Sequence, residues 1–297
     1  AQNLVLDLKH RDEVIESSIR IEDSITVTGM RRSKAWATNQ YVFFVMKFSR
    51  PFRDKGIWQN DTLQERSLSE ISNAKNLKAY FSFDPSETDS LLVKVAISPV
   101  SVEGAIKNLE AELPGWDFEQ TKEAATAAWN TELSRISVTS KDTNKLVIFY
   151  TALYHTAIVP NINMDVDHRY RGRDNEIHQA DGFNYYSVFS LWDTYRGAHP
   201  LYTIIDQART IDYIKTFLVQ YQQGGRLPVW ELASNETDCM IGYHSVPVIA
   251  DAYLKGINDF DTVLALEAMK KSANWNHLGL PAYISKGLLE TGDEPES

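Results

Sequence analysis

The segment Ser190–Gly256 reads SLWDTYRGAHPLYTIIDQARTIDYIKTFLVQYQQGGRLPVWELASNETDCMIGYHSVPVIADAYLKG and contains two polar loops rich in aromatic residues. The first loop is Leu191–Pro200, and the second is Leu227–His244. Each loop leads into a segment whose apolar residues recur with helical spacing, the first of them being Tyr202–Gln223. We therefore predict a helical domain that presents both loops on one rim, because loops on a rigid scaffold commonly carry function.

The two loops carry the side-chain types that a sugar-binding cleft needs. Tryptophan faces stack on the C–H faces of sugar rings. Arginine and carboxylate groups form strong hydrogen bonds with hydroxyls. The predicted substrate-binding residues are Trp192, Asp193, Arg196, Trp230, Glu231 and Glu236.

Each of these residues also has a structural interpretation. Asp193 and Arg196 could form a buried ion pair that ties the first loop down. Glu231 and Glu236 could belong to a hydrogen-bonded rim loop instead of acting on a substrate. Glycosidases use two carboxyl groups, about 6.5–9.5 Å apart when the anomeric configuration is inverted and about 5–5.5 Å apart when it is retained. The sequence does not supply that distance, so the catalytic residues stay unassigned.

Composition and charge exclude several classes of protein. The chain has 297 residues, which allows two domains of about 150 residues each. Its net charge of -10 disfavours a nucleic-acid partner, because phosphate binding needs clustered Lys and Arg. A run of about 18 apolar residues that could span a membrane is missing from the sequence. The first residues, AQNLVLDLKH, do not resemble a signal peptide.

Residues 1–115 are predicted to form a β-sandwich. Short alternating or β-branched runs such as NLVLDL, QYVFFVMKFS and LKAYFSF are separated by turn residues. The polar segment Arg53–Lys75 is expected to be a long loop or a hairpin arm. The abrupt start at AQNLVLDL is compatible either with a natural edge strand or with further strands upstream. Residues 116–138 are predicted to form a linker helix with Asp117 as its N-cap.

Residues 139–297 are predicted to be the first part of an α/α toroid. Asp142 is expected to cap the helix NKLVIFYTALYHTAIV, whose dense apolar residues indicate burial on most sides. Gly224 and Gly225 end the helix Tyr202–Gln223. Asp259 or Asp261 is expected to cap a helix that reaches Trp275, and the final stretch GLPAYISKGLLETGDEPES is expected to be a loop.

The segment NMDVDHRYRG contains Asp165, Asp167 and His168, which could suggest a metal loop. It lacks the ligand spacing and the closing Glu of an EF-hand. A loop with salt bridges to the neighbouring arginines is the favoured interpretation, and no metal ligand is assigned.

Several blocks of this sequence resemble glycoside hydrolase family 92, the calcium-dependent exo-acting α-mannosidases. The blocks are GMRRSKAWATNQYVFFVMKFSRPF, WNTELSRI, FYTALYHTAIVPNINMDVDHRYRG, SLWDTYRGAHPL, QQGGRLPVWELASNETDCMIGYH and VIADAYLKGI. The resemblance implies an N-terminal β-sandwich followed by an (α/α)6 toroid. It also implies hydrolysis of terminal α-linked mannose with inversion, assisted by calcium, on glycans outside the cytoplasm. By resemblance, Asp193 with its neighbours Trp192 and Arg196 would hold the mannose.

The family blocks that carry the general acid, the base and the calcium ligands are not found in this chain. We therefore expect it to be an internal portion of a larger enzyme that is inactive by itself, and no catalytic role is assigned to Glu231 or Glu236. Two other interpretations stay open: a non-catalytic carbohydrate-binding protein, and another α/α-toroid glycosidase or lyase.

Overall fold

The computed structural model describes residues 2–84, 90–277 and 279–293, and the chain divides into two compact units. The first unit contains Ala1–Thr121 and Asn163–Arg171, and the second contains Lys122–Ile162 and Gly172–Ser297. The domain boundaries at residues 115 and 138 that we drew from the sequence stay a prediction.

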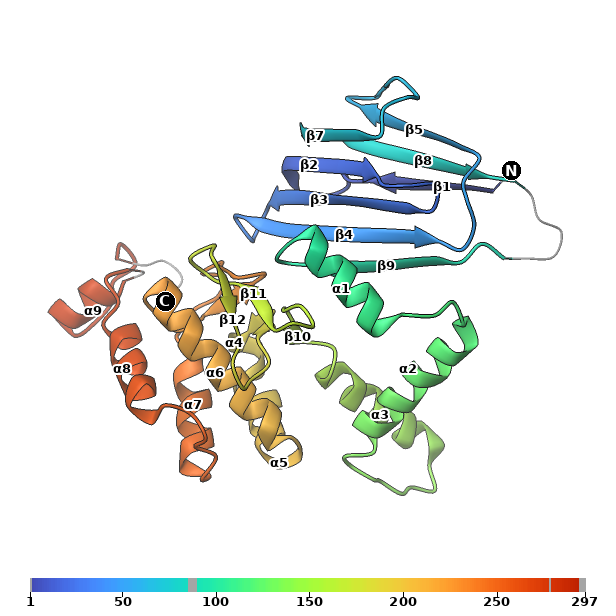
Figure 1. Cartoon of the computed structure of the whole chain (residues 1–297). Coiled ribbons are helices and arrows are strands. Elements are labelled where there is room, and N and C mark those ends of the chain that lie inside the picture. Colours follow the sequence, from blue (N-terminus) through green and yellow to red (C-terminus); the bar gives the residue numbers. More distant parts are fainter. Residues whose placement is uncertain (1, 85–89, 278, 294–297) are drawn as a thin grey trace. The chain divides into compact units, whose positions relative to one another are not determined.

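The first unit is built on two antiparallel sheets (Figure 1). One sheet has the order β1 (Gln2–Asp7), β8 (Leu77–Phe83), β5 (Asp54–Gln59) and β6 (Thr62–Leu63). The other has the order β7 (Glu70–Ala74), β2 (Glu13–Ile21), β3 (Thr26–Lys34), β4 (Gln40–Phe48) and β9 (Val93–Ser98). Both sheets contribute side chains to one apolar core, so this unit is a β-sandwich.

The sandwich core follows from the alternation in the sequence. Along β8, every second residue from Leu77 to Phe83 is buried and the intervening residues are half-buried. Phe48 of β4 meets Phe81 and Phe83 of β8 with ring centroids 5.3 and 5.1 Å apart. Aromatic pairs in this range of separation stabilise a core beyond the area that they bury.

Two elements of the sandwich modify the expectations from sequence. The helix α1 (Val102–Glu112) covers β4 and β9, with Ala105 and Leu109 packed on Val45. The segment Arg53–Lys75 is more regular than a long loop, because it contains β5, β6 and β7. Its strands are hard to recognise from sequence, since β5 buries only Gly56 and Ile57 and is otherwise half-buried.

The second unit is mainly helical. Its helices are α3 (Thr143–Thr156), α4 (Leu191–Thr194), α5 (Ala198–Ile205), α6 (Gln207–Gly224), α7 (Ser245–Leu254), α8 (Thr262–Ala273) and α9 (Leu280–Lys286). The helix α2 (Phe118–Leu133) leads into it. Its short strands are β10 (Asn161–Ile162), β12 (Ile177–Gln179), β13 (Tyr186–Ser187), β14 (Phe189–Ser190), β15 (Trp230–Leu232) and β16 (Asn235–Glu236), while β11 (Arg169–Arg171) belongs to the first unit.

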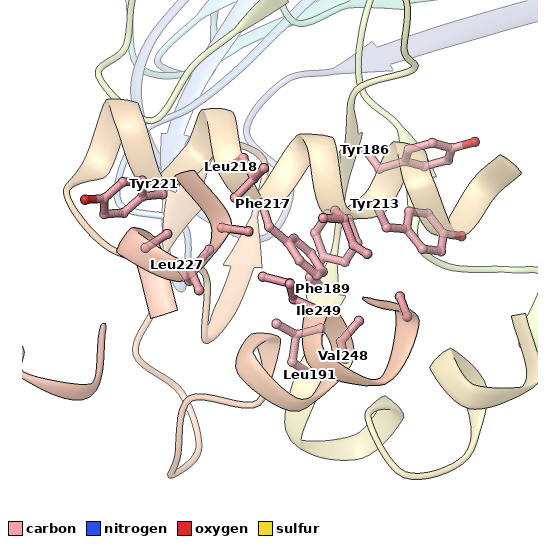
Figure 2. Close-up of a cluster of buried hydrophobic side chains, with 14 of the residues drawn as sticks. Tyr186, Phe189, Leu191, Tyr213, Phe217, Leu218, Tyr221, Leu227, Val248 and Ile249 are labelled. Atoms are coloured by element: carbon pink, nitrogen blue, oxygen red, sulfur yellow. The ribbon is translucent and has the colours of Figure 1, made fainter. Parts of the chain in front are cut away.

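The helix α6 is central to the apolar core of the second unit. Figure 2 shows Phe217 of α6 next to Phe189, above Ile249 of α7 and Leu191 of α4. The rings of Phe189 and Phe217 meet edge to face, with centroids 4.8 Å apart. Because Phe189 and Leu191 are both buried, the short segment that leads into the first polar loop is fixed in place by the core.

Three helical expectations were wrong. The helix predicted at Tyr202–Gln223 is two helices, α5 and α6, because the Asp206 side chain accepts the backbone N–H of Arg209 and starts a new helix. The helix α3 is not buried on most sides, since Val147 and Ile148 are 60% and 68% exposed. The final stretch is not entirely loop, because it contains α9.

Candidate functional site

The two polar loops are adjacent because a small sheet joins the segments that lead into them. The sheet has the order β14, β15 and β16, and Ser190 of β14 lies opposite Trp230 of β15. Forty residues separate these two positions in the sequence. The sheet thus places Ser190, which lies just before the Trp192–Asp193 segment, beside Trp230. Predicted site residues from the two loops are brought together in this way.

Trp192 and Asp193 lie on the exposed side of α4. Trp192 is 44% exposed, and Asp193 is exposed as well. The Ser190 hydroxyl donates a hydrogen bond to Oδ2 of Asp193, which orients the carboxylate. A sugar that rests on the indole would therefore have an oriented acceptor for its hydroxyls nearby.

Arg196 does not form the buried ion pair with Asp193 that was one of the two interpretations. Both residues are exposed, and the Nε of Arg196 donates to the Tyr195 hydroxyl at 2.5 Å. Among the described residues, no ion pair joins Asp193 and Arg196. The guanidinium also lies 5.2 Å from the centre of the Tyr195 ring. Its position is set by the aromatic ring, and its charge stays accessible to a ligand.

A stacked pair of rings joins the two loops a second time. Tyr195 of the first loop and His244 at the end of the second are nearly parallel, with ring centres 4.1 Å apart and 4° between the planes. Gly242 makes room for this stack, since a Cβ at that position would lie 2.6 Å from Nε2 of His244. Burial and then the charge of Arg196 lower the pKa of His244, so the ring is neutral near pH 7.

The side chain of Glu231 is completely buried, with 0% of its surface exposed. Oε1 accepts hydrogen bonds from the Ser187 hydroxyl at 3.1 Å and the Ser234 N–H at 2.5 Å, and Oε2 accepts one from the Val188 N–H at 3.1 Å. Burial raises the pKa of Glu231 to about 8, and the bonds from Ser234 and Ser187 counteract part of that rise. The predicted substrate contact is therefore not a direct one, because this carboxylate binds the protein itself.

Glu236 also serves the loop that carries it. Its carboxylate accepts the backbone N–H groups of Val229 at 2.9 Å, Trp230 at 2.8 Å and Asp238 at 3.1 Å. A guanidinium nitrogen of Arg173 lies 3.9 Å away, and both of these side chains are only 7% exposed. Glu236 thus fixes the backbone of Trp230, and the hydrogen-bonded rim loop was the better of its two interpretations.

The two loops could be predicted from the sequence, but the contacts that hold them could not. The stack of Tyr195 on His244 and the hydroxyl of Ser187 were outside the predicted site residues. Both residue types were visible in the sequence, but nothing in their spacing connects them across 40 or more positions. The available signal was the pair of glutamates within one loop, since a glutamate that becomes buried needs hydrogen-bond donors from elsewhere in the chain.

The chain matches the glycosyl hydrolase family 92 catalytic domain over residues 104–296 and the family 92 N-terminal domain over residues 1–98. The chain belongs to glycosyl hydrolase family 92. The family 92 α-mannosidase BT3965 from Bacteroides thetaiotaomicron is 36% identical and superposes with a TM-score of 0.93 over 98% of this chain and 40% of its own. The fold class predicted from the sequence is thereby confirmed.

Two further relatives extend the comparison within family 92. The inverting mannosidase BT2199 from Bacteroides thetaiotaomicron is 28% identical, with a TM-score of 0.86 over 97% of this chain and 40% of its own. A protein of Arthroderma benhamiae described as an uncharacterized secreted glycosidase is 29% identical over 213 residues, which are 67% of this chain and 23% of that protein. The chain thus spans less than half the length of these relatives.

The described residues do not by themselves fit the calcium ion that the family resemblance implies. Calcium takes about six to eight oxygen ligands. Within residues 2–84, 90–277 and 279–293, no group of three or more His, Cys, Asp or Glu side chains could hold a metal ion. In the same residues, no helix is long and apolar enough to cross a membrane.

The acidic loop of the first unit forms protein contacts of its own. Asp165 is 1% exposed and accepts hydrogen bonds from the Ser98 hydroxyl at 2.8 Å and the Asn108 amide at 2.9 Å. Asp167 pairs with Lys107 at 2.8 Å and with a neighbouring arginine. The interpretation as a salt-bridged loop therefore describes this segment better than a metal loop does.

Replacing Asp165 with alanine should lower the free energy of unfolding by about 2–3 kcal/mol, because two buried donors lose their acceptor. Replacing Asp167 with alanine should cost less than about 1 kcal/mol, because its ion pairs are near the surface. Urea denaturation of both variants would measure these changes. Equal effects of the two substitutions would contradict this account of the loop.

Proposed function

We propose that the intact protein is an exo-acting α-mannosidase that hydrolyses terminal α-linked mannose on glycans. The observation that carries this proposal is the exposed Trp192–Asp193 pair, held beside Trp230 on a family 92 scaffold. The related BT3965 α-mannosidase has been solved in complex with mannoimidazole, a relationship that supports a mannose-shaped ligand for this chain as well. Linkage to a glycan leaves only the terminal sugar free to enter such a site.

Within this proposal, the side chains of this chain bind and orient the sugar. Asp193 accepts hydrogen bonds from two sugar hydroxyls, and Arg196 donates to a third. The indole of Trp192 covers a C–H face of the ring. Because the Asp193 carboxylate is already oriented by Ser190, the sugar is held in one pose without much loss of side-chain entropy on binding.

The chemical step that we propose is a single displacement with inversion, the outcome named for the relative BT2199. One carboxylic acid protonates the glycosidic oxygen, and one carboxylate activates a water on the opposite face of the sugar. Glu231 and Glu236 serve neither role, because their oxygens are occupied by backbone donors in the protein. Both groups, and the ligands of a calcium ion, would come from side chains outside the described residues.

We also propose that the protein acts outside the cytoplasm. The Arthroderma benhamiae relative is described as secreted, which supports this location. Fractionation of the source cells with an antibody against this chain would test the proposal. Recovery of the protein only with cytoplasmic markers would contradict it.

The test of the function compares two proteins on an aryl α-mannoside and on a mannose-terminated glycan. The intact protein should release mannose, with loss of activity in a calcium chelator and recovery when calcium is added. The 297-residue chain by itself should bind mannose-configured ligands weakly and release none. An intact protein that binds mannosides but never hydrolyses them would instead be a carbohydrate-binding protein. Release of mannose by the 297 residues alone would refute the proposal that the catalytic acid and base lie outside the described residues.

A further inference from the structure

Three residues beside the proposed sugar site have a backbone conformation that L-amino acids rarely adopt. Val188 has a φ of 70°, and the consecutive residues Ala233 and Ser234 have φ values of 48° and 66°. None of them is a glycine, and a β-branched valine in this region is a clear outlier. Such conformations persist only where the surrounding structure holds them.

The N–H groups of all three residues donate to the same pair of buried side chains. Val188 and Ser234 donate to the two oxygens of Glu231, at 3.1 and 2.5 Å. Ala233 donates to the Ser187 hydroxyl at 2.7 Å, and that hydroxyl in turn donates to Glu231 at 3.1 Å. A single carboxylate with its serine therefore holds every one of these strained positions.

These strained positions directly flank the proposed sugar-binding residues. Val188 lies immediately before β14, which runs into Trp192 and Asp193. Ala233 and Ser234 form the turn between β15, which carries Trp230, and β16. A change in either turn would move the residues that meet the sugar.

We infer that Glu231 is a positioning residue for the proposed substrate site, whose carboxylate holds the turns at Val188 and at Ala233–Ser234 and so fixes Trp192, Asp193 and Trp230 relative to one another. This inference rests on the proposed function for its ligand, but the order that it assigns to the two turns can be measured without any ligand.

The electrostatic surroundings of Glu231 support a role in positioning and none in the chemical step. The charged groups that act on Glu231 are Glu236, which raises its pKa, and Arg173, which lowers it, both after the larger effect of burial. Arg173 lies nearer to Glu236, at 3.9 Å, and no ion pair of Glu231 itself occurs within the described residues. A buried carboxyl group without its own cation is costly to ionise, and the three donors that it receives compensate only part of that cost, so its pKa stays raised.

Replacing Glu231 with glutamine is the direct test. Glutamine keeps the size of the side chain but accepts at only one of the two oxygen positions, so either Val188 or the Ser187–Ser234 pair then faces an amide NH2 group. In the intact protein, hydrogen exchange of residues 188–193 and 232–236 should become at least about tenfold faster than in the wild type. The affinity for mannoimidazole should fall about tenfold or more, since small displacements of binding groups have large effects.

Matched variants separate positioning from a general loss of stability. Glu176→Gln makes the same change at an exposed glutamate of the same unit and should alter neither readout. Adding Ala233→Gly to Glu231→Gln should recover part of the affinity, because glycine adopts positive φ without strain. If Glu231→Gln does not fold, Ser187→Ala removes one donor and one acceptor of the same cluster and should give smaller changes in the same direction.

The outcomes distinguish this inference from the function on which it rests. A folded Glu231→Gln or Ser187→Ala protein with wild-type hydrogen exchange in both turns overturns the inference, whatever its activity. A wild-type protein that neither binds mannoimidazole nor hydrolyses mannosides overturns the proposed function alone, and faster exchange in the variant still supports the positioning role.

Discussion

Replacing Asp193 with alanine is expected to lower kcat/KM of the intact protein for a terminal α-mannoside about 100- to 1000-fold. The reason is that an exposed, oriented carboxylate is the group in this chain best placed to accept two sugar hydroxyls. Hydrogen bonds to a charged group contribute about 1.5–3 kcal/mol each. Two of them sum to about 3–6 kcal/mol, and the lower part of that range, about 3–4 kcal/mol, corresponds to the predicted factor. Steady-state kinetics of the purified variant would measure it.

The control for this substitution is Asp181→Ala, which removes another exposed aspartate from the same unit. That variant should retain wild-type kinetics. Circular dichroism and melting temperature of Asp193→Ala should stay close to the wild-type values, because the side chain is on the surface. A folded Asp193→Ala protein whose kcat/KM is within threefold of the wild type would mean that the sugar does not bind at this loop.

The second large effect is a dependence of stability on pH that Glu231 imposes. Its folded pKa of about 8 lies above the ordinary value of 4.5 for an exposed glutamate. The folded state therefore binds the proton more tightly than the unfolded state. The resulting stabilisation is complete below pH 4.5 and is lost as the pH rises toward 8. The free energy of unfolding should fall by at most about 1.4 kcal/mol per pH unit in this window, or about 4 kcal/mol between pH 5 and 8.

The measurement is the difference in unfolding free energy between the wild type and Glu231→Gln at several pH values from 5 to 8.5. Glutamine does not titrate, so the unfolding free energy of the wild type should fall relative to that of Glu231→Gln as the pH rises. The buried His199, whose pKa burial lowers to about 4, destabilises the protein as the pH falls below 6.5. It is present in both proteins, so its effect cancels. Parallel curves for the two proteins would show that the Glu231 carboxyl does not titrate in this range.

Much of the fold could be predicted from the pattern of apolar residues. Strict alternation at Leu77–Phe83 predicted a sandwich strand, and Asp117, Asp142 and Asp261 were found at the starts of helices where their side chains accept backbone N–H groups. The break at Asp206 was missed, because the apolar spacing continues through it and only the observed cap shows that the helix restarts. A local hydrogen bond thus sets a helix boundary that the regular spacing of the apolar residues does not reveal.

The candidate site divides in the same way. The sequence indicated which two loops matter, because tryptophans, acids and an arginine gather in Leu191–Pro200 and Leu227–His244. It also favoured a role for Asp193, which the structure leaves exposed and oriented. It did not show that Glu231 is buried among three donors, since a glutamate has the same letter code whether it meets solvent or the protein interior.

By itself, the sequence determined the class of this protein: a β-sandwich followed by helices, with blocks of family 92 and two aromatic, acidic loops. Only the tertiary structure decided how those loops are held. Ser190 faces Trp230 through strand pairing, Tyr195 stacks on His244, and Glu231 receives donors from both sides. Apolar periodicity is a local property that each segment expresses alone. The burial of a carboxylate and its hydrogen bonds depend on residues some 40 positions away, and only folding brings these together.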